Sequence, residues 1–173
     1  MEFSTISPSV DESPLPDESA EKLVLRLAQK KAMAVAETHP DALIIGSDQV
    51  ATVAGRILGK PGSHERAVEQ LMQASGQRVT FFTGLSLYNS RTRHMQSCCE
   101  PFHVLFRSLQ KPEIENYLDK EKPYNCAGSF KSEGLGICLF ERLEGKDPNA
   151  LIGLPLIRLI DMLRSEGVDI LAQ

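Results

Sequence analysis

Sequence features that mark several common enzyme and metal-binding classes are absent from this chain. Its four cysteines form no Cys-x-x-Cys pair and its four histidines show no metal-ligand spacing, which argues against a zinc site. No Gly-x-Ser-x-Gly elbow and no Walker-type loop occurs, so neither an α/β-hydrolase nucleophile nor a P-loop is predicted. Gly134 and Gly136 lack the third glycine and the preceding strand of a dinucleotide-binding fold.

The chain also contains no long apolar run and no amino-terminal signal segment. We therefore expect no membrane span and no membrane partner. Cys98 and Cys99 are adjacent and cannot readily bridge each other, and the cysteine spacing is not that of a disulfide framework. These features predict a cytoplasmic protein with reduced thiols.

The charge balance lacks the basic excess that nucleic-acid binding requires. The 173 residues carry a net charge of −4, which argues against a nucleic-acid partner. Local lysines and a metal ion can still bind a small anion. The 42% hydrophobic and 24% charged fractions are ordinary for a globular protein, and the length fits a single domain over residues 1–173, with two lobes around a cleft as one arrangement.

Apolar patterns and turn signals alternate helices with strands along the chain. Capping residues and a 3.6-residue apolar period predict helices over residues 19–37, 63–75, 112–118 and 156–163. Residues rich in β-formers predict strands over 43–45, 50–53, 78–88, 102–106 and 136–140, and a short strand over 3–6. In the helices, Met72 and Ile160 are expected on the buried side. The fold class that fits is α/β, a mixed twisted sheet with flanking helices.

Asp48 is the most informative residue of the sequence. It follows the apolar strand 43–45, and we predict that the strand opens there into a polar turn. A carboxylate at the carboxyl end of a strand can hold a divalent cation or accept a proton in a cleft. A solvent-exposed turn aspartate is the alternative.

Two lysines flank Asp48 in the sequence. Lys31 falls in the middle of the apolar stripe of helix 19–37, so either its ammonium has a partner or an opening, or its stem runs past the helix edge. Lys60 lies between Gly59 and Pro61, which suits a fixed phosphate-binding amine, although an ordinary turn lysine has the same pattern.

Three further polar residues are candidates for a binding site. Glu12 lies in an acidic loop that could complete a shell of oxygen ligands around a metal, or could favour the amino terminus of the following helix. Gln49 could read the hydrogen-bonding edge of a ligand or face solvent. Glu133 could accept hydrogen bonds from a base or form the tip of a hairpin.

Taken in order along the chain, five short motifs resemble those of the Maf family of nucleotide pyrophosphatases. They are Ile44-Ile45-Gly46-Ser47-Asp48-Gln49-Val50, Gly59-Lys60-Pro61, Thr83-Gly84, Cys126-Ala127-Gly128-Ser129-Phe130 and Leu151-Ile152-Gly153-Leu154-Pro155. The resemblance covers essentially the whole chain. Gln49 together with Phe130-Lys131-Ser132-Glu133-Gly134 resembles the branch that cleaves 7-methyl-GTP, whereas the branch acting on dTTP and UTP typically has Thr after the aspartate.

The resemblance implies a Maf-like, inosine triphosphatase-like fold with two lobes around a cleft. It implies hydrolysis between the α- and β-phosphates of a small-molecule nucleotide, a divalent cation (Mg²⁺ or Mn²⁺), and the removal of noncanonical nucleotides. By position, Asp48 matches the proton acceptor of the family and, with Glu12, its metal-binding carboxylates. Lys31 and Lys60 match the phosphate-binding lysines, and Gln49 and Glu133 match positions that set base choice.

One motif of the family does not occur in this sequence. The family opens with a strand and a Ser-x-Ser-Pro-x-Arg-Arg loop that supplies phosphate ligands, and the match here begins downstream of it. We expect an incomplete sheet edge that favours self-association, a homodimer for example, and weak or no activity of this 173-residue form. A Maf-like protein that binds nucleotides or a partner without turnover, and a dTTP/UTP pyrophosphatase, are the alternative functions.

Overall fold

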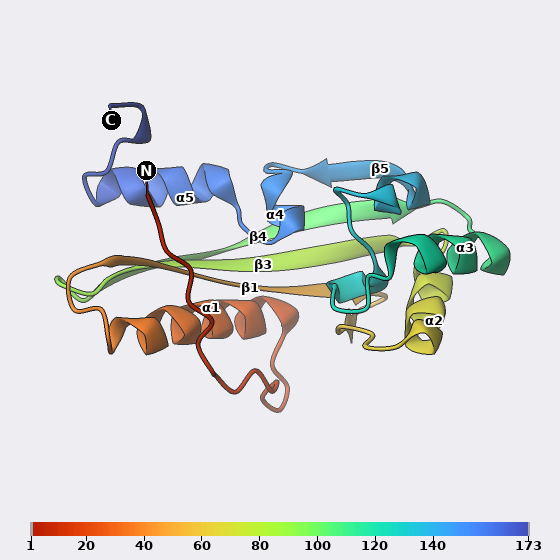
Figure 1. Ribbon diagram of the computed structural model, residues 1–173, viewed down its shortest axis with the longest axis horizontal. Helices are drawn as coiled ribbons and strands as arrows, with labels where there is room; N and C mark the ends of the chain where they lie inside the picture. The colour runs from red at the N-terminus through yellow and green to blue at the C-terminus, as the bar shows by residue number, and fades with distance from the viewer. Residues whose placement is uncertain (1, 173) are drawn as a thin grey trace.

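The computed structural model describes residues 2–172 and contains a five-stranded sheet as its centre (Figure 1). The strands are β1 (Leu43–Val53), β2 (Arg56–Leu58), β3 (Arg78–Asn89), β4 (His94–Phe106) and β5 (Phe140–Gly145). Their order is β2-β1-β3-β4-β5, and all four pairings are antiparallel where a mixed sheet was expected. Antiparallel hairpins need only short connections, which agrees with the tight turns between β1 and β2 and between β3 and β4.

Helices flank this sheet and confirm the predicted α/β class. They are α1 (Ala20–Ala36), α2 (His64–Ala74), α3 (Lys111–Glu121), α4 (Asn149–Ile152), α5 (Leu156–Ser165) and the 3₁₀ helices η1 (Ala127–Ser129), η2 (Leu135–Leu139) and η3 (Ile170–Ala172). Figure 1 shows α1 and α5 on opposite faces at one end of the long strands, with α2 and α3 at the other end. Within the described part of the chain, no helix combines the length and the apolar character needed to span a bilayer.

Helix α1 lies unusually close to the sheet. Ser19 caps the helix by accepting a hydrogen bond from the backbone nitrogen of Lys22, as predicted. The strands opposite the helix carry Gly46 and Gly84, where a Cβ atom would collide with the backbone of α1. These two glycines therefore set the distance between helix and sheet, and with it the position of every side chain on the inner face of α1.

Two apolar clusters hold the layers together. The larger one lies at the α2 and α3 end, and its aromatic centre packs Phe81, Phe106, Phe130 and Phe140 edge to face with ring centroids 4.7–5.7 Å apart. The smaller one joins α5 to the opposite end of β3. Between the two clusters, Ser47, Gln49 and the buried Thr83 place polar side chains in the middle of β1 and β3, facing the α4 segment.

Several local predictions are wrong. Asp48 does not follow a strand: β1 continues through it, and Asp48 pairs with Gly84 in mid-strand. Residues 136–140 mostly form η2, and β5 begins at Phe140. Residues 3–6 form no strand. Met72 and Ile160 are 44% and 36% exposed, because α2 and α5 each bury only a narrow stripe.

Candidate active site

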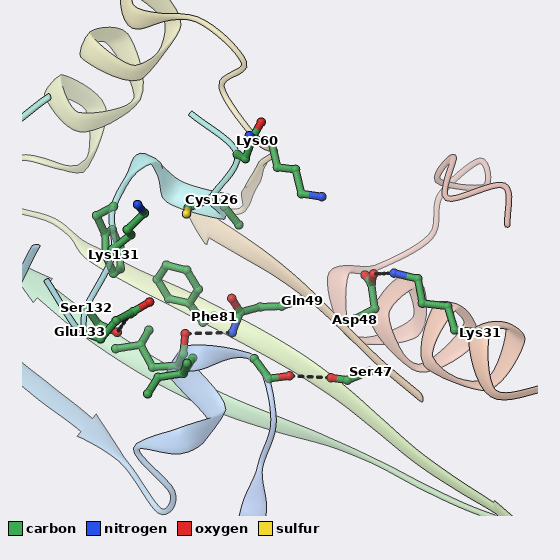
Figure 2. Close-up of a pocket in the computed structure, with 16 residues that line it drawn as sticks. Lys31, Ser47, Asp48, Gln49, Lys60, Phe81, Cys126, Lys131, Ser132 and Glu133 are labelled. Carbon is green, nitrogen blue, oxygen red and sulfur yellow. Dashed lines mark hydrogen bonds and ion pairs between the residues drawn. The ribbon is translucent and has the colours of Figure 1, made fainter. Parts of the chain in front are cut away.

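A cavity of about 330 Å³ lies beside the middle of β1 (Figure 2). Its wall draws on α1, the middle of β1, the segment before α2, the loop after η1, and α4. All but one of the six predicted site residues line it: Lys31, Asp48, Gln49, Lys60 and Glu133. The volume falls within the range of small-molecule sites, so segments far apart in the sequence form one candidate ligand site.

The sixth residue, Glu12, reaches the site through Lys31. The Nζ atom of Lys31 lies 2.7 Å from Oδ1 of Asp48 and 2.7 Å from Oε1 of Glu12. Of the two interpretations of Lys31, the inward one is confirmed: its ammonium points at a carboxylate and does not run past the helix edge. One cation thus bridges two carboxylates at one end of the cavity.

Burial and charge act against each other at this contact. Burial raises the pKa of Asp48, and the hydrogen bond and charge of Lys31 only partly offset the rise, so the pKa stays above its ordinary value. Burial lowers the pKa of Lys31, but its bonds to the two carboxylates outweigh burial and raise it. The hydrogen bond from Lys31 lowers the pKa of Glu12. Asp48 is therefore the more basic of the two carboxylates.

Lys60 supplies a second ammonium group on the cavity wall. It follows β2 and precedes the buried Pro61, and the next residue, Gly62, donates its backbone N–H to the carbonyl of Tyr124 at 2.9 Å. The segment is thus held after Lys60 by a buried ring and a hydrogen bond to a neighbouring loop, and before Lys60 by Gln70, whose Nε2 atom donates to the carbonyl of Gly59 at 3.0 Å. Lys131 also lines the cavity, a cation that the sequence analysis did not single out.

The loop that carries Glu133 is held tightly by its own backbone and by α3. The carbonyl of Lys131 accepts hydrogen bonds from the N–H groups of Gly134 and Gly136, at 3.3 and 3.1 Å. The Lys131 backbone nitrogen donates to the Tyr117 hydroxyl at 3.1 Å. Glu133 itself is exposed and lines the cavity, so the backbone that carries it is held while its carboxylate is open to a ligand.

Gln49 lies on the opposite face of β1 from Asp48 and contacts the segment at α4. Its Nε2 atom donates to the carbonyl of Ala150 at 2.7 Å and to the hydroxyl of Thr83 at 2.9 Å. Ser47, on the same face, donates to the carbonyl of Gly153 at 2.7 Å. The sequence analysis missed Ser47 and Thr83 as site residues. Both residues lie in motifs that carry the family resemblance, which is the signal that could have identified them.

The carboxylates of Glu12 and Asp48 are suited to a divalent cation that enters the site together with a ligand. Within residues 2–172 there is no cluster of three or more histidine, cysteine, aspartate or glutamate residues that could hold a metal alone. Glu12 and Asp48 nevertheless converge on a single cationic atom, the Nζ of Lys31. Mg²⁺ is commonly bound through one or two carboxylates with phosphates of a ligand completing its shell, so this pair could hold a divalent cation together with a phosphate group.

Comparisons with known proteins identify the family. The family model described as Maf-like protein matches residues 1–166. The chain is 56% identical over 171 residues to the 7-methyl-GTP pyrophosphatase of Aliivibrio fischeri, covering 99% of this chain and 89% of that protein. It is 56% identical over 170 residues to the 7-methyl-GTP pyrophosphatase of Alcanivorax borkumensis, covering 98% and 86%. This protein therefore belongs to the Maf family.

Proposed function

We propose that this protein is a nucleoside triphosphate pyrophosphatase that hydrolyses 7-methyl-GTP to 7-methyl-GMP and pyrophosphate. The observation that carries the proposal is the contact of Lys31 with Asp48 at one end of a cavity that also contains Lys60 and Glu133. Two relatives with this activity in their names, each 56% identical to the chain, support the choice of substrate.

The lysines bind the polyphosphate. Lys31 and Lys60 are ammonium groups on the wall of one cavity, and they neutralise the phosphate oxygens and the charge that develops during transfer. Glu12 and Asp48 would hold a divalent cation, Mg²⁺ or Mn²⁺. When bound, such a cation supplies Lewis-acid polarisation of the phosphate.

Asp48 activates the water. A water molecule attacks one phosphorus of the α–β link, the bond from that phosphorus to the bridging oxygen breaks, and the proton of the water passes to Asp48. The raised pKa of Asp48 makes it a better proton acceptor than an ordinary aspartate. Lys31 keeps the carboxylate ionised before the reaction, because its charge opposes the effect of burial.

The base occupies the end of the cavity near Glu133 and Gln49. A 7-methylguanine ring carries a positive charge, which a nearby carboxylate stabilises and which GTP lacks. Glu133 lines the cavity, and its side chain is exposed there. The preference for the methylated base therefore comes from the Glu133 carboxylate.

A substrate panel tests this function. Pyrophosphate release is measured with 7-methyl-GTP, GTP, dTTP and UTP in the presence of Mg²⁺. We expect the highest kcat/KM for 7-methyl-GTP. A higher value for dTTP or UTP would assign the protein to the other branch, and nucleotide binding without pyrophosphate release from any of the four would make it a binding protein.

A further inference from the structure

The amide group of Gln49 is held in one orientation. Its Nε2 atom lies 2.7 Å from the carbonyl oxygen of Ala150, 3.3 Å from that of Leu151 and 2.9 Å from the hydroxyl oxygen of Thr83. All three neighbours accept hydrogen bonds from it. Turning the amide over would place Oε1 against two carbonyl oxygens and leave these acceptors without their donor, which is costly for half-buried groups.

Thr83 makes this arrangement more specific. Its side chain is fully buried, and its hydroxyl donates to the carbonyl of Ala150 at 2.8 Å. Because the single proton of that hydroxyl is committed to Ala150, Thr83 meets Gln49 only as an acceptor. Thr83 therefore selects the nitrogen of the Gln49 amide, not its oxygen, as its neighbour.

The oxygen of Gln49 is left for a ligand. Among residues 2–172, no donor contacts Oε1, and no fully buried side-chain nitrogen or oxygen lacks a partner, so Oε1 is open to the cavity. Figure 2 shows the nitrogen of Gln49 joined to a backbone oxygen and its oxygen pointing the other way, into the space that the labelled residues surround. Gln49 thus presents an acceptor to the cavity.

We propose that Thr83 is a positioning residue: it fixes the Gln49 amide with its oxygen toward the cavity, so that Gln49 meets the base only as a hydrogen-bond acceptor. The inference rests on the proposed function and adds which edge of the base is read. The Gln49 oxygen and the Glu133 carboxylate are both acceptors that line the cavity. They match the adjacent N1–H and 2-amino donors of a guanine, whereas adenine offers an acceptor at N1 and is rejected.

The orientation can be measured without activity. In ¹⁵N-labelled protein of 19.1 kDa, the side-chain NH₂ signals of Gln49 are assigned by their absence from the spectrum of Gln49→Leu. We expect them to exchange with water at least about tenfold more slowly than those of the exposed Gln73, since they are hydrogen-bonded. Thr83→Val, which removes the hydroxyl at nearly constant volume, should reduce this protection, and Thr83→Ser should retain it. Exchange as fast as that of Gln73 in the unmodified protein would overturn the proposal.

The selectivity is measured with modified nucleotides. Inosine triphosphate lacks the 2-amino group, and N1-methyl-GTP lacks the N1–H. We expect kcat/KM for at least one of them to fall about tenfold or more below that for GTP, and this ratio to shrink in Thr83→Val but not in Thr83→Ser. Equal kcat/KM for all three in the unmodified protein would overturn the role of Gln49 while leaving the pyrophosphatase function intact. Absence of turnover would overturn that function instead, and the exchange measurement would still decide the orientation.

Discussion

The Nζ atom of Lys31 in α1 lies 2.7 Å from Oδ1 of Asp48 in the middle of β1. The contact depends on the close packing of helix on sheet that Gly46 and Gly84 permit. It is partly shielded from solvent, with side chains 22% and 11% exposed for the lysine and the aspartate. The charge of Lys31, the burial of Asp48 and the position of α1 therefore act together at this contact. Substitutions can change the charge of Lys31 and the position of α1 one at a time.

Removing the lysine should impair both phosphate binding and the ionisation of Asp48. For Lys31→Met we expect kcat/KM to fall about 10² to 10³-fold, as when one stabilising charge is lost from an active site. Because Lys31 lowers the pKa of Asp48 against the effect of burial, its loss raises that pKa further. The acid limb of the pH–rate profile should then move to higher pH. Lys22→Met, on the exposed side of the same helix, is the matched control and should leave rate and profile unchanged.

Moving the helix away from the sheet should have a similar effect without touching a charge. In Gly84→Ala the new methyl group meets the backbone of Val24, so α1 must shift. We expect a loss of about 1–3 kcal/mol in the free energy of unfolding and a lower kcat. Gly59→Ala places its methyl group in open space and serves as the control for the melting temperature. Equal melting temperatures of the two variants would show that the glycine is not needed for close packing.

Much of this arrangement is predictable from local sequence. The capping residue Ser19 and the apolar period of α1 place Lys31 on the inner face, and that placement alone suggests a partner for its charge. The family resemblance then brings together the residues that line the cavity. Local signals suffice for the placement of Lys31, because helix periodicity and capping act within a few residues.

The rest depends on contacts between distant parts of the chain. The polar run Gly46 to Gln49 resembles a turn, but eleven consecutive pairs with β3 keep it extended. The partners of Gln49, Ala150 and Leu151, lie about a hundred residues further along. No local pattern encodes such pairings, so the strand position of Asp48 and the role of Thr83 appear only in the folded structure.

Replacing the Gln49 amide by a carboxylate should destabilise the protein. Gln49→Glu puts an oxygen where Nε2 now donates to Ala150 and Thr83, so acceptors face one another. We expect a loss of about 1–3 kcal/mol at neutral pH. The loss should shrink as pH falls, because a protonated carboxyl can donate again. Gln73→Glu, on the exposed face of α2, controls for the added charge. Thermal melts at pH 7.5 and at pH 5 check both effects, and an unchanged melting temperature at pH 7.5 would contradict the hydrogen bonds described.

The preference for a charged base should depend on Glu133. In Glu133→Gln we expect the ratio of kcat/KM for 7-methyl-GTP over GTP to fall about tenfold, with the GTP value little changed, since only the methylated base carries the charge that the carboxylate meets. Glu141→Gln, exposed on β5, should keep the ratio. An unaltered ratio in Glu133→Gln would assign the preference to another residue.

The most direct test is pyrophosphate release from 7-methyl-GTP by the unmodified protein and by Asp48→Asn. Asparagine keeps the shape of the side chain but cannot accept the proton, so the account predicts a loss of at least about a hundredfold in kcat, and loss of activity of both proteins when EDTA removes the divalent cation. Asp41→Asn, at an exposed aspartate that lies 3.8 Å from Arg91, should retain full activity. Release by Asp48→Asn at the rate of the unmodified protein would contradict the account.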